Sequence, residues 1–328
     1  MNEIDSAAQN GALWGGFVGD AHAMPGHWYY DRKALHRDYG YIVEYQAPRN
    51  PHPDSILWRS SYVAENDRGQ ILHDQAKYWG QRGVHYHQNL AAGENTLNLQ
   101  LAYLLRESLR DHDGYAPEDY LERYIEFMLT PGSHRDTYIE EYHRNFFTNY
   151  SRGKLPRACG QTDIHIGGLA HVGVLSAWFH QDLAQAREAV REHVRLTHAN
   201  DAVLHAADTL TKILIATMNS MPLRQAIVVY GNDCFSEKRS EELYGRPDDV
   251  VIGNVFSPAC YIQDAFPATL YLAWKYAESF AAGIIANTNV GGDNCHRGAV
   301  LGSLLGAAVG FDGIPPNFIT GLKLHGAL

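Results

Sequence analysis

Apolar residues recur at helical spacing along most of the chain, and strict apolar–polar alternation is nearly absent. Between residues 97 and 108 they fall at intervals of three and four, which places them on one helix face. The pattern recurs over 117–129, 135–147, 182–198, 201–219, 265–277 and 278–288. The sequence therefore predicts an all-α protein.

Caps and breaks refine this prediction. Asn95 or Thr96 can cap the helix that begins near residue 97, and Ser133 with Asp136 resembles a capping box for the helix over 135–147. Two stretches, 45–93 and 221–257, resist assignment to helices. The first is rich in proline, histidine and aromatic residues. Because long loops in compact domains are commonly functional and this composition argues against disorder, we expect an ordered loop there.

The first and last helical segments carry glycine at every fourth position. These glycines are Gly11, Gly15 and Gly19, and Gly298, Gly302, Gly306 and Gly310. Each costs about 1 kcal/mol of helix stability relative to alanine, so we expect the bare faces to allow close helix packing. If the two helices pack antiparallel, Asp20 meets the turn at 293–296, and residues 94–96 join a polar cluster. Three ordinary helix caps are the alternative interpretation.

Composition and charge limit the partners and the cellular compartment that we expect for this protein. The 328 residues carry 27 basic against 37 acidic side chains, a net charge of −10, and no run of Lys or Arg exceeds two. Nucleic acid and anionic membranes are therefore not expected as partners. The stretch 298–311 is too short and glycine-rich to span a bilayer. The start of the chain lacks signal-peptide character, and the four cysteines form no CxxC pair, so we expect a cytoplasmic protein.

Several motifs then point to a family. The opening "GALWGGFVGDAHAMPGHWY" and the closing "NTNVGGDNCHRGAVLGSLLGAAVG" resemble the first and last motifs of the ADP-ribosylglycohydrolase family, of the dinitrogenase-reductase-activating type. "GENTLNLQLAYLLRESL", "LTHANDAVLHAA", "DAFPATLYLA" and "GIPPNF" follow in the family's order. The resemblance implies one domain over residues 1–328, folded as a compact orthogonal helical bundle with a central cleft.

The resemblance also implies a chemistry from which this sequence departs. In the family, the acidic residues of TDDT and GGDTDT hold two magnesium ions that orient ADP-ribose, and a bond at the ribose anomeric carbon is hydrolysed. Here Glu94 and Asn95 stand for the Asp-Asp pair. Asp293 matches the first aspartate of GGDTDT, Cys295 replaces the second, and His296 replaces the threonine after it.

This depleted ligand set predicts that magnesium is not strongly bound. At most two carboxylates of the set remain, whereas thiol and imidazole favour softer ions such as zinc. One magnesium ion, one transition-metal ion or no metal stay open, so the cofactor is unknown. In the opening motif, His27 also replaces an acid that can serve catalysis.

The candidate site residues fall into three groups. The catalytic candidates are His27, Asp293, Cys295 and His296. The metal or polar cluster comprises Asp20, Glu94, Asn95, Thr96 and Asp293. The substrate-binding candidates come from the glycine-rich loop "CGQTDIHIGGLAHVG" and the closing turn, and are His165, Gly167, Gly168, His171, Gly291 and Gly292. For each histidine, a buried and hydrogen-bonded structural role is the alternative.

Cys295 has opposing influences on its pKa. A helix N-terminus, His296 and Arg297 favour the thiolate, whereas Asp293 and Glu94 disfavour it. The direction of the shift depends on distances that the sequence does not contain. A small buried hydrophobic side chain is the alternative interpretation.

Three functions remain at this point. The first is a hydrolase that cleaves an N- or O-glycosidic bond of an ADP-ribosyl or nucleoside-like substrate. The second is a diverged family member that performs other Cys/His-dependent chemistry on a small metabolite. The third is a non-catalytic binding protein, like the lens crystallins that share this fold. An open cleft favours the first two, and a cleft filled by side chains favours the third.

Overall fold

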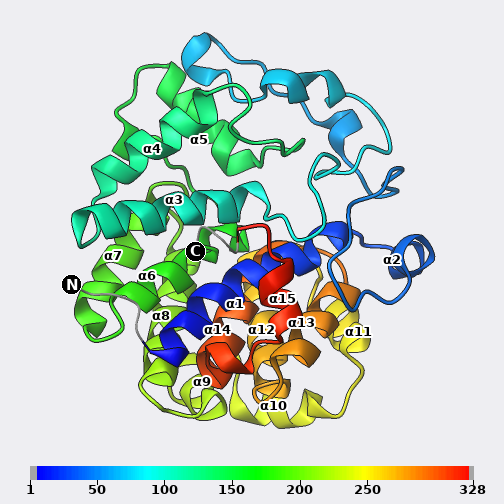
Figure 1. Ribbon diagram of the computed structural model, residues 1–328, viewed down its shortest axis with the longest axis vertical. Coiled ribbons are helices and arrows are strands. Elements are labelled where there is room, and N and C mark those ends of the chain that lie inside the picture. Colours follow the sequence, from blue (N-terminus) through cyan, green and yellow to red (C-terminus); the bar gives the residue numbers. More distant parts are fainter. Residues whose placement is uncertain (1–5, 325–328) are drawn as a thin grey trace.

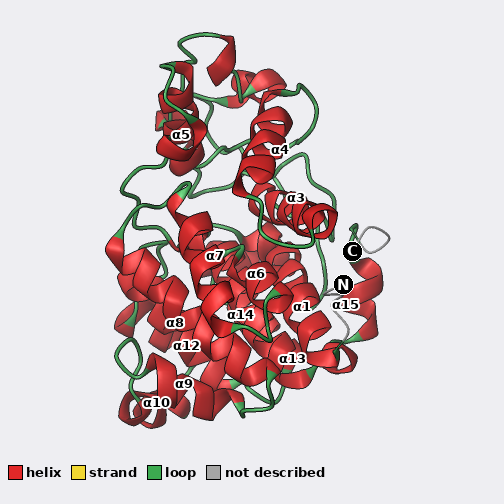
Figure 2. Ribbon diagram, turned by 90° about the vertical axis from the view of Figure 1, so that its left-hand side faces the viewer, coloured by secondary structure: helices red, strands yellow, loops and turns green. Residues whose placement is uncertain are grey.

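The computed structural model describes residues 6–324 and consists of helices joined by loops (Figures 1 and 2). The described residues form no β-strand, and isolated bridges such as the one between His165 and Tyr261 are the nearest approach to one. The all-α prediction is confirmed. None of the described helices is long and apolar enough to cross a bilayer.

The α-helices are α1 (Ala7–Ala23), α2 (Arg32–Tyr39), α3 (Leu97–His112), α4 (Pro117–Leu129), α5 (Glu141–Ser151), α6 (Val172–Trp178), α7 (Leu183–Arg195), α8 (Asp201–Met218), α9 (Leu223–Gly231), α10 (Glu237–Tyr244), α11 (Asp248–Val250), α12 (Ile262–Lys275), α13 (Phe280–Asn289), α14 (Asn294–Val309) and α15 (Pro316–Gly321). Helices α3, α4 and α5 lie toward one end of the molecule, and α8 to α13 lie toward the other (Figures 1 and 2). The antiparallel pair α1 and α14 lies between them, within the largest cluster of buried apolar side chains.

Helices α1 and α14 meet through their glycines, as the spacing predicts. Gly11 lies against Gly306, Gly15 against Gly302, and Gly19 against Gly298. A Cβ atom at Gly302 would lie 1.9 Å from the Gly15 carbonyl oxygen, closer than any van der Waals contact allows. We call these six residues the glycine seam. The two helices are this close because no side chain stands between them.

The segment from residue 45 to 93 contains no α-helix and is ordered by other means. Its regular elements are short 3-10 turns at Leu57–Arg59, Asp67–Gly69 and His73–Tyr78. It nevertheless buries a set of polar and aromatic side chains, namely His52, Tyr86, His85 and His87. The second irregular stretch, 221–257, consists of α9, α10 and α11 followed by a π-helical turn. The loop predicted at 45–93 is therefore present and contributes to the interior.

The capping box predicted for residues 133–136 is wrong. Helix α5 begins at Glu141, and the Ser133 hydroxyl donates to the Thr130 carbonyl at 2.9 Å. Asp136 instead accepts the Leu97 N–H at 2.5 Å, across the chain at the start of α3. Thr96 is the N-cap residue of α3, but its side chain makes no capping bond. An unpaired N–H at the start of a helix needs an acceptor, and Asp136 supplies it from a distant loop.

Candidate functional site

An open pocket of about 380 Å³ lies where several loops meet the start of α5. Its lining residues are mostly aromatic, with acidic and basic groups among them: Trp28, Tyr30, Ile56, Arg59, Tyr86, Tyr138, Glu140, Glu141, His165, Cys260 and Tyr261. A concave, aromatic pocket with a few converging polar groups is typical of small-molecule sites. The structure therefore has an open pocket beside these loops, while the residues of the opening and closing motifs lie buried behind it.

Behind the pocket wall, His296 lies between two carboxylates. Its Nε2 atom is 2.9 Å from Glu140 Oε1 and its Nδ1 atom is 2.7 Å from Asp293 Oδ1. Burial alone would lower the pKa of His296, but the charges of Asp293 and Glu140 outweigh it and raise that pKa well above its usual value. Burial likewise opposes ionisation of Asp293, yet His296 and His27 hold its pKa below the usual range. Without a metal, this arrangement is an imidazolium between two carboxylates.

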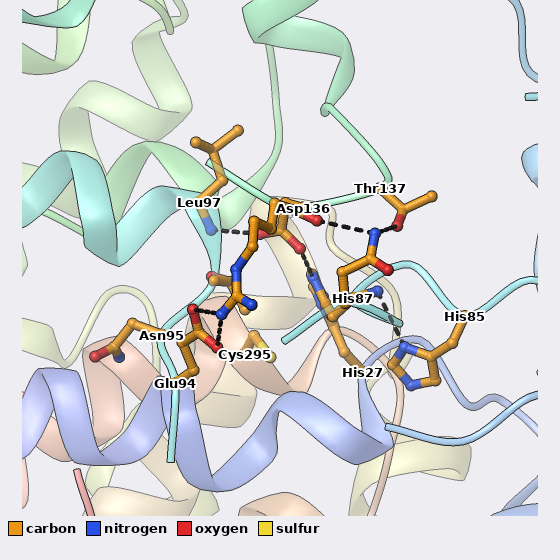
Figure 3. Close-up of polar contacts among 12 residues, drawn as sticks. His27, His85, His87, Glu94, Asn95, Leu97, Asp136, Thr137 and Cys295 are labelled. Atoms are coloured by element: carbon orange, nitrogen blue, oxygen red, sulfur yellow. Dashed lines mark hydrogen bonds and ion pairs between the residues drawn. The ribbon is translucent and has the colours of Figure 1, made fainter. Parts of the chain in front are cut away.

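A line of imidazole and carboxylate groups continues from Asp293 into the interior, and Figure 3 shows its members His27, His87 and Asp136. His27 Nε2 is 3.0 Å from Asp293 Oδ1, and His27 Nδ1 is 2.6 Å from His87 Nε2. His87 Nδ1 makes a short contact with Asp136, which also faces the Leu97 N–H. Burial lowers the pKa of His27 to about 3 against the opposing effect of Asp293, so this ring is neutral.

We call this group the histidine network. Its members are His27, His87 and His296 with Asp136, Asp293 and Glu140. Glu140 is the member that reaches the pocket, whereas the others are almost completely buried.

The two glycines of the closing turn position Asp293 without lining the pocket. Gly291 and Gly292 both have φ of +66°, a conformation that side chains disfavour. Trp28 N–H donates to the Gly292 carbonyl at 2.8 Å, and the Gly292 N–H donates to the Tyr29 carbonyl at 2.7 Å. A Cβ atom at Gly292 would lie 2.1 Å from the Pro258 carbonyl oxygen. The turn therefore fixes Asp293 and His27 side by side through the backbone.

Cys295 is completely buried and does not line the pocket. Its neighbours in a small buried cluster are Ala23, Met24 and Leu90, and its thiol donates to the Asp20 carbonyl at 3.6 Å. Burial raises the pKa of the Cys295 thiol well above its usual value, with the nearby acids adding to the effect. The opposing influences expected from the sequence are thus resolved against the thiolate. The same contact shows that the end of α1 meets the start of α14.

The predicted polar cluster divides into two parts. Asp20 accepts from Asn95 Nδ2 at 2.9 Å, from the Thr96 N–H at 2.9 Å and from the Thr96 hydroxyl at 2.7 Å. Burial raises the pKa of Asp20 to about 6 against these hydrogen bonds. Glu94 takes no part, because it pairs with Arg135 at 2.5 Å and accepts the Ala91 N–H.

These contacts do not fit a pair of magnesium ions. Asn95 directs its amide nitrogen toward Asp20, Glu94 is neutralised by Arg135, and His296 and Cys295 offer no oxygen. Asp293 remains as one carboxylate with an imidazole on either side. Magnesium requires near-octahedral oxygen ligands, which this group of side chains does not supply.

The predicted substrate-binding residues lie in different places. His165 lines the pocket, with Nδ1 2.8 Å from Asp163 Oδ1. Burial opposes its protonation, but Asp163 and the neighbouring Cys260 raise the pKa of His165 to about 11. Burial raises the pKa of the Cys260 thiol even though His165 opposes the shift. Asp163 therefore favours the protonated form of His165, and burial favours the neutral form of the Cys260 thiol.

His171 lies elsewhere, beside a small internal cavity. With Gly167 and Gly168 it borders a space of about 20 Å³, and its Nε2 atom is 2.8 Å from the Asn98 carbonyl oxygen. His198 lines the same cavity. This space is large enough for about one water molecule and not for a substrate.

Three members of the histidine network are not among the predicted site residues: His87, Asp136 and Glu140. The "HYH" pattern at 85–87 was a usable signal, because it lies in a loop already singled out for its histidines and aromatic residues. Asp136 resembles part of a capping box with Ser133, and this local pattern gives no sign of its contact with His87. Glu140 carried no signal beyond a charge at the start of a helix.

Comparisons with known proteins agree with the motifs. The family model described as ADP-ribosylglycohydrolase matches residues 6–328. A solved structure described as "ADP-ribosylglycohydrolase-related protein complex" is similar in fold, with a TM-score of 0.65 and 20% sequence identity. The match covers 98% of this chain and 93% of that chain. No curated protein matches the sequence.

Proposed function

Because the chain belongs to the ADP-ribosylglycohydrolase family, we propose that it hydrolyses an N- or O-glycosidic bond of an ADP-ribosyl or nucleoside-like substrate in the open pocket. The observation that carries this proposal is Glu140. Its carboxylate is on the pocket wall and is paired from behind with the buried His296. Glycoside hydrolysis commonly depends on such a positioned carboxylate.

The proposed reaction uses the free side of Glu140. His296 occupies Oε1, which leaves Oε2 to accept a proton from a water molecule that attacks the anomeric carbon. The glycosidic bond breaks, the ribosyl group keeps the new hydroxyl, and the leaving group takes a proton from solvent. The negative charges of Glu140 and the adjacent Glu141 favour the cationic character that the sugar carbon develops.

The other side chains that line the pocket suit a nucleotide-like substrate. Aromatic faces suit a base or a sugar, whereas Arg59 and the protonated His165 supply positive charge for phosphate groups. In this proposal Asp293, His296 and His27 position Glu140 rather than touch the substrate, and Cys295 has no chemical role.

The test compares two adjacent acids. Purified protein is incubated with N-linked and O-linked ADP-ribosyl substrates and with nucleosides, and the released ribosyl product is quantified by chromatography. Glu140→Gln should lower kcat at least about 100-fold, the range expected for losing a general base. Glu141→Gln lines the same pocket without contacting His296 and should have a smaller effect. Equal activity of Glu140→Gln and the unmodified protein refutes this assignment.

A second function, thiol chemistry, is favoured by one specific observation. Cys260, His165 and Asp163 lie side by side at the pocket, where the Ile166 N–H donates to the Cys260 carbonyl at 2.8 Å and fixes the two segments together. A nucleophilic role would require the Cys260 thiol to lose its proton when substrate binds. Loss of turnover in Cys260→Ser, with Glu140→Gln still active, would favour this function over the first.

A further inference from the structure

The contacts of the histidine network converge on Asp293. Asp293 Oδ1 is 3.0 Å from His27 Nε2 and 2.7 Å from His296 Nδ1. His27 Nδ1 faces His87 Nε2, and His87 Nδ1 faces Asp136, which also accepts the Leu97 N–H. Two imidazole nitrogens therefore point at one buried carboxylate.

A second observation lies at the centre of the network. Asp293 Oδ2 has no hydrogen-bond partner although the residue is only 1% exposed. Buried polar atoms of this kind commonly indicate a bound water molecule or ion. The other oxygen of this carboxylate, Oδ1, contacts two imidazole nitrogens, so the group as a whole is an environment that would attract a cation.

We propose that His27 Nε2, Asp293 and His296 Nδ1 bind one divalent ion of the zinc class. These ligand atoms lie within 4.8 Å of one another, and the rings of His27 and His296 meet at 80°, so their nitrogens converge from different directions. Two imidazoles and a carboxylate suit zinc and similar ions better than magnesium. This inference is independent of the proposed hydrolysis, because it rests on the ligand geometry alone.

An ion at this position is compatible with the hydrogen bonds of the network. With the ion on Nε2, His27 can donate from Nδ1 to His87 Nε2, and His87 can donate from Nδ1 to Asp136. With the ion on His296 Nδ1, the Nε2 atom of that ring remains beside a carboxylate, 2.9 Å from Glu140 Oε1. Metal-binding histidines almost always have a carboxylate, carbonyl or water as the partner of the far ring nitrogen. Three protein ligands also leave a position for water, which is the pattern of catalytic zinc sites.

An adjacent group of possible ligands is less suitable. His27 Nδ1, His87 Nε2 and Cys295 also lie close together. The two rings, however, are within 1° of parallel and their nitrogens are 2.6 Å apart, which is the distance of a direct hydrogen bond. Nitrogens of parallel rings that point at each other do not converge on a common ion, unlike those of His27 and His296. The Cys295 thiol is moreover engaged with the Asp20 carbonyl.

Metal titration of the full chain tests the site. An exposed group of His205, Asp233 and Cys234 also has ligand spacing, so every variant carries His205→Ala to remove it. After treatment with a chelator, the protein is titrated with Zn²⁺ by calorimetry, and its metal content is measured by mass spectrometry. One ion per chain should bind, and His296→Gln should abolish it. His198→Gln, which removes an equally buried histidine outside the network, should retain it.

Two further measurements keep the test decisive if His296→Gln does not fold. Asp136→Asn touches no ion and should weaken zinc binding about 10–100-fold through His87. The Co²⁺ form should show no thiolate-to-cobalt absorption. A thiolate band that disappears in Cys295→Ser would overturn the ligand set, and so would zinc binding that is unchanged in a folded His296→Gln protein.

The absence of any stoichiometric ion in folded protein would refute the inference outright. Hydrolysis measured on the same samples separates the two proposals. Turnover without a bound ion would refute only the metal site, and a bound ion without turnover would refute only the proposed function.

Discussion

The glycine seam and the histidine network are both buried, but they hold the molecule together in opposite ways. In the seam, Gly15 and Gly302 bring two helices together because neither has a side chain. In the network, His27, Asp293 and His296 bring segments together through directional contacts between polar side chains. The seam is regular because it repeats one helix period, and the network is irregular because loops supply much of it. A change of volume should therefore break the seam, whereas a change of charge or hydrogen bonding should act on polar clusters such as the network.

The largest effect is expected from adding a side chain to the seam. Gly302→Leu would place atoms inside the backbone of α1, where even a Cβ atom lies 1.9 Å from the Gly15 carbonyl oxygen. The helices must separate, so we expect a loss of about 3 kcal/mol or more in the free energy of unfolding, and little soluble protein. Urea titration followed by circular dichroism measures this loss.

The matched control for the seam is Gly245→Ala. No atom lies within 4 Å of a Cβ built at Gly245, so this substitution should leave stability within about 0.5 kcal/mol. Normal stability of the Gly302→Leu variant would show that the two helices can move apart without cost.

The difference between the glycine seam and the histidine network also explains which contacts could be predicted from the sequence. Glycines at every fourth position lie on one helix face wherever the helix packs, so the pairing of α1 with α14 follows from a local pattern. The contact of His87 with Asp136 joins residues 49 positions apart from two loops, and no periodicity encodes such a contact. Asp136 shows the consequence, because its neighbours suggested a helix cap and the fold used it elsewhere. Asp293 and His296 were found only through the motif that contains them.

The next largest effect is expected where the seam meets the polar residues. Asp20 ends the glycine face of α1 and accepts three hydrogen bonds from Asn95 and Thr96. Asp20→Ala leaves those buried donors without an acceptor and should cost about 3 kcal/mol in the free energy of unfolding. Asp67→Ala removes an exposed acid and serves as the control in the same urea titration. A loss below about 1 kcal/mol for Asp20→Ala would mean that water replaces the carboxylate.

Lowering the pH should reduce stability through the buried polar residues and not through the glycine seam, because the seam contains no titratable group. Burial lowers the pKa of His22, His52 and His198 to about 4. The unfolded chain takes up a proton at each near pH 6.5, whereas the folded protein does so only near pH 4. Stability should therefore fall as pH drops from 6.5 to 4, by up to about 1.4 kcal/mol per pH unit for each histidine. Asp20, whose pKa is raised to about 6, partly offsets this loss at the acidic end.

The contribution of one histidine can be isolated with His22→Gln. Its side chain keeps a donor for the Thr288 hydroxyl, which His22 Nδ1 contacts at 2.7 Å, but does not titrate. Between pH 6 and 5 the slope of unfolding free energy against pH should fall by about 1.4 kcal/mol per unit relative to the unmodified protein. An unchanged slope would show that His22 is protonated inside the folded protein.

The smallest effect concerns Cys295, which lies between the two regions. It follows Asp293 of the network by two residues, and its side chain packs with Ala23, Met24 and Leu90 on one side while its thiol lies near His27 and His87. If packing is its role, Cys295→Ala should cost only about 1 kcal/mol, the value of one small buried group. Because burial raises the pKa of its thiol, alkylation of Cys295 in folded protein should be no faster than unfolding, while the pocket-lining Cys260 reacts first. Peptide mapping after timed alkylation at pH 7 to 9 measures both rates. Labelling of Cys295 ahead of Cys260, at a rate independent of urea, would place this thiol with the reactive groups of the network and contradict the packing role.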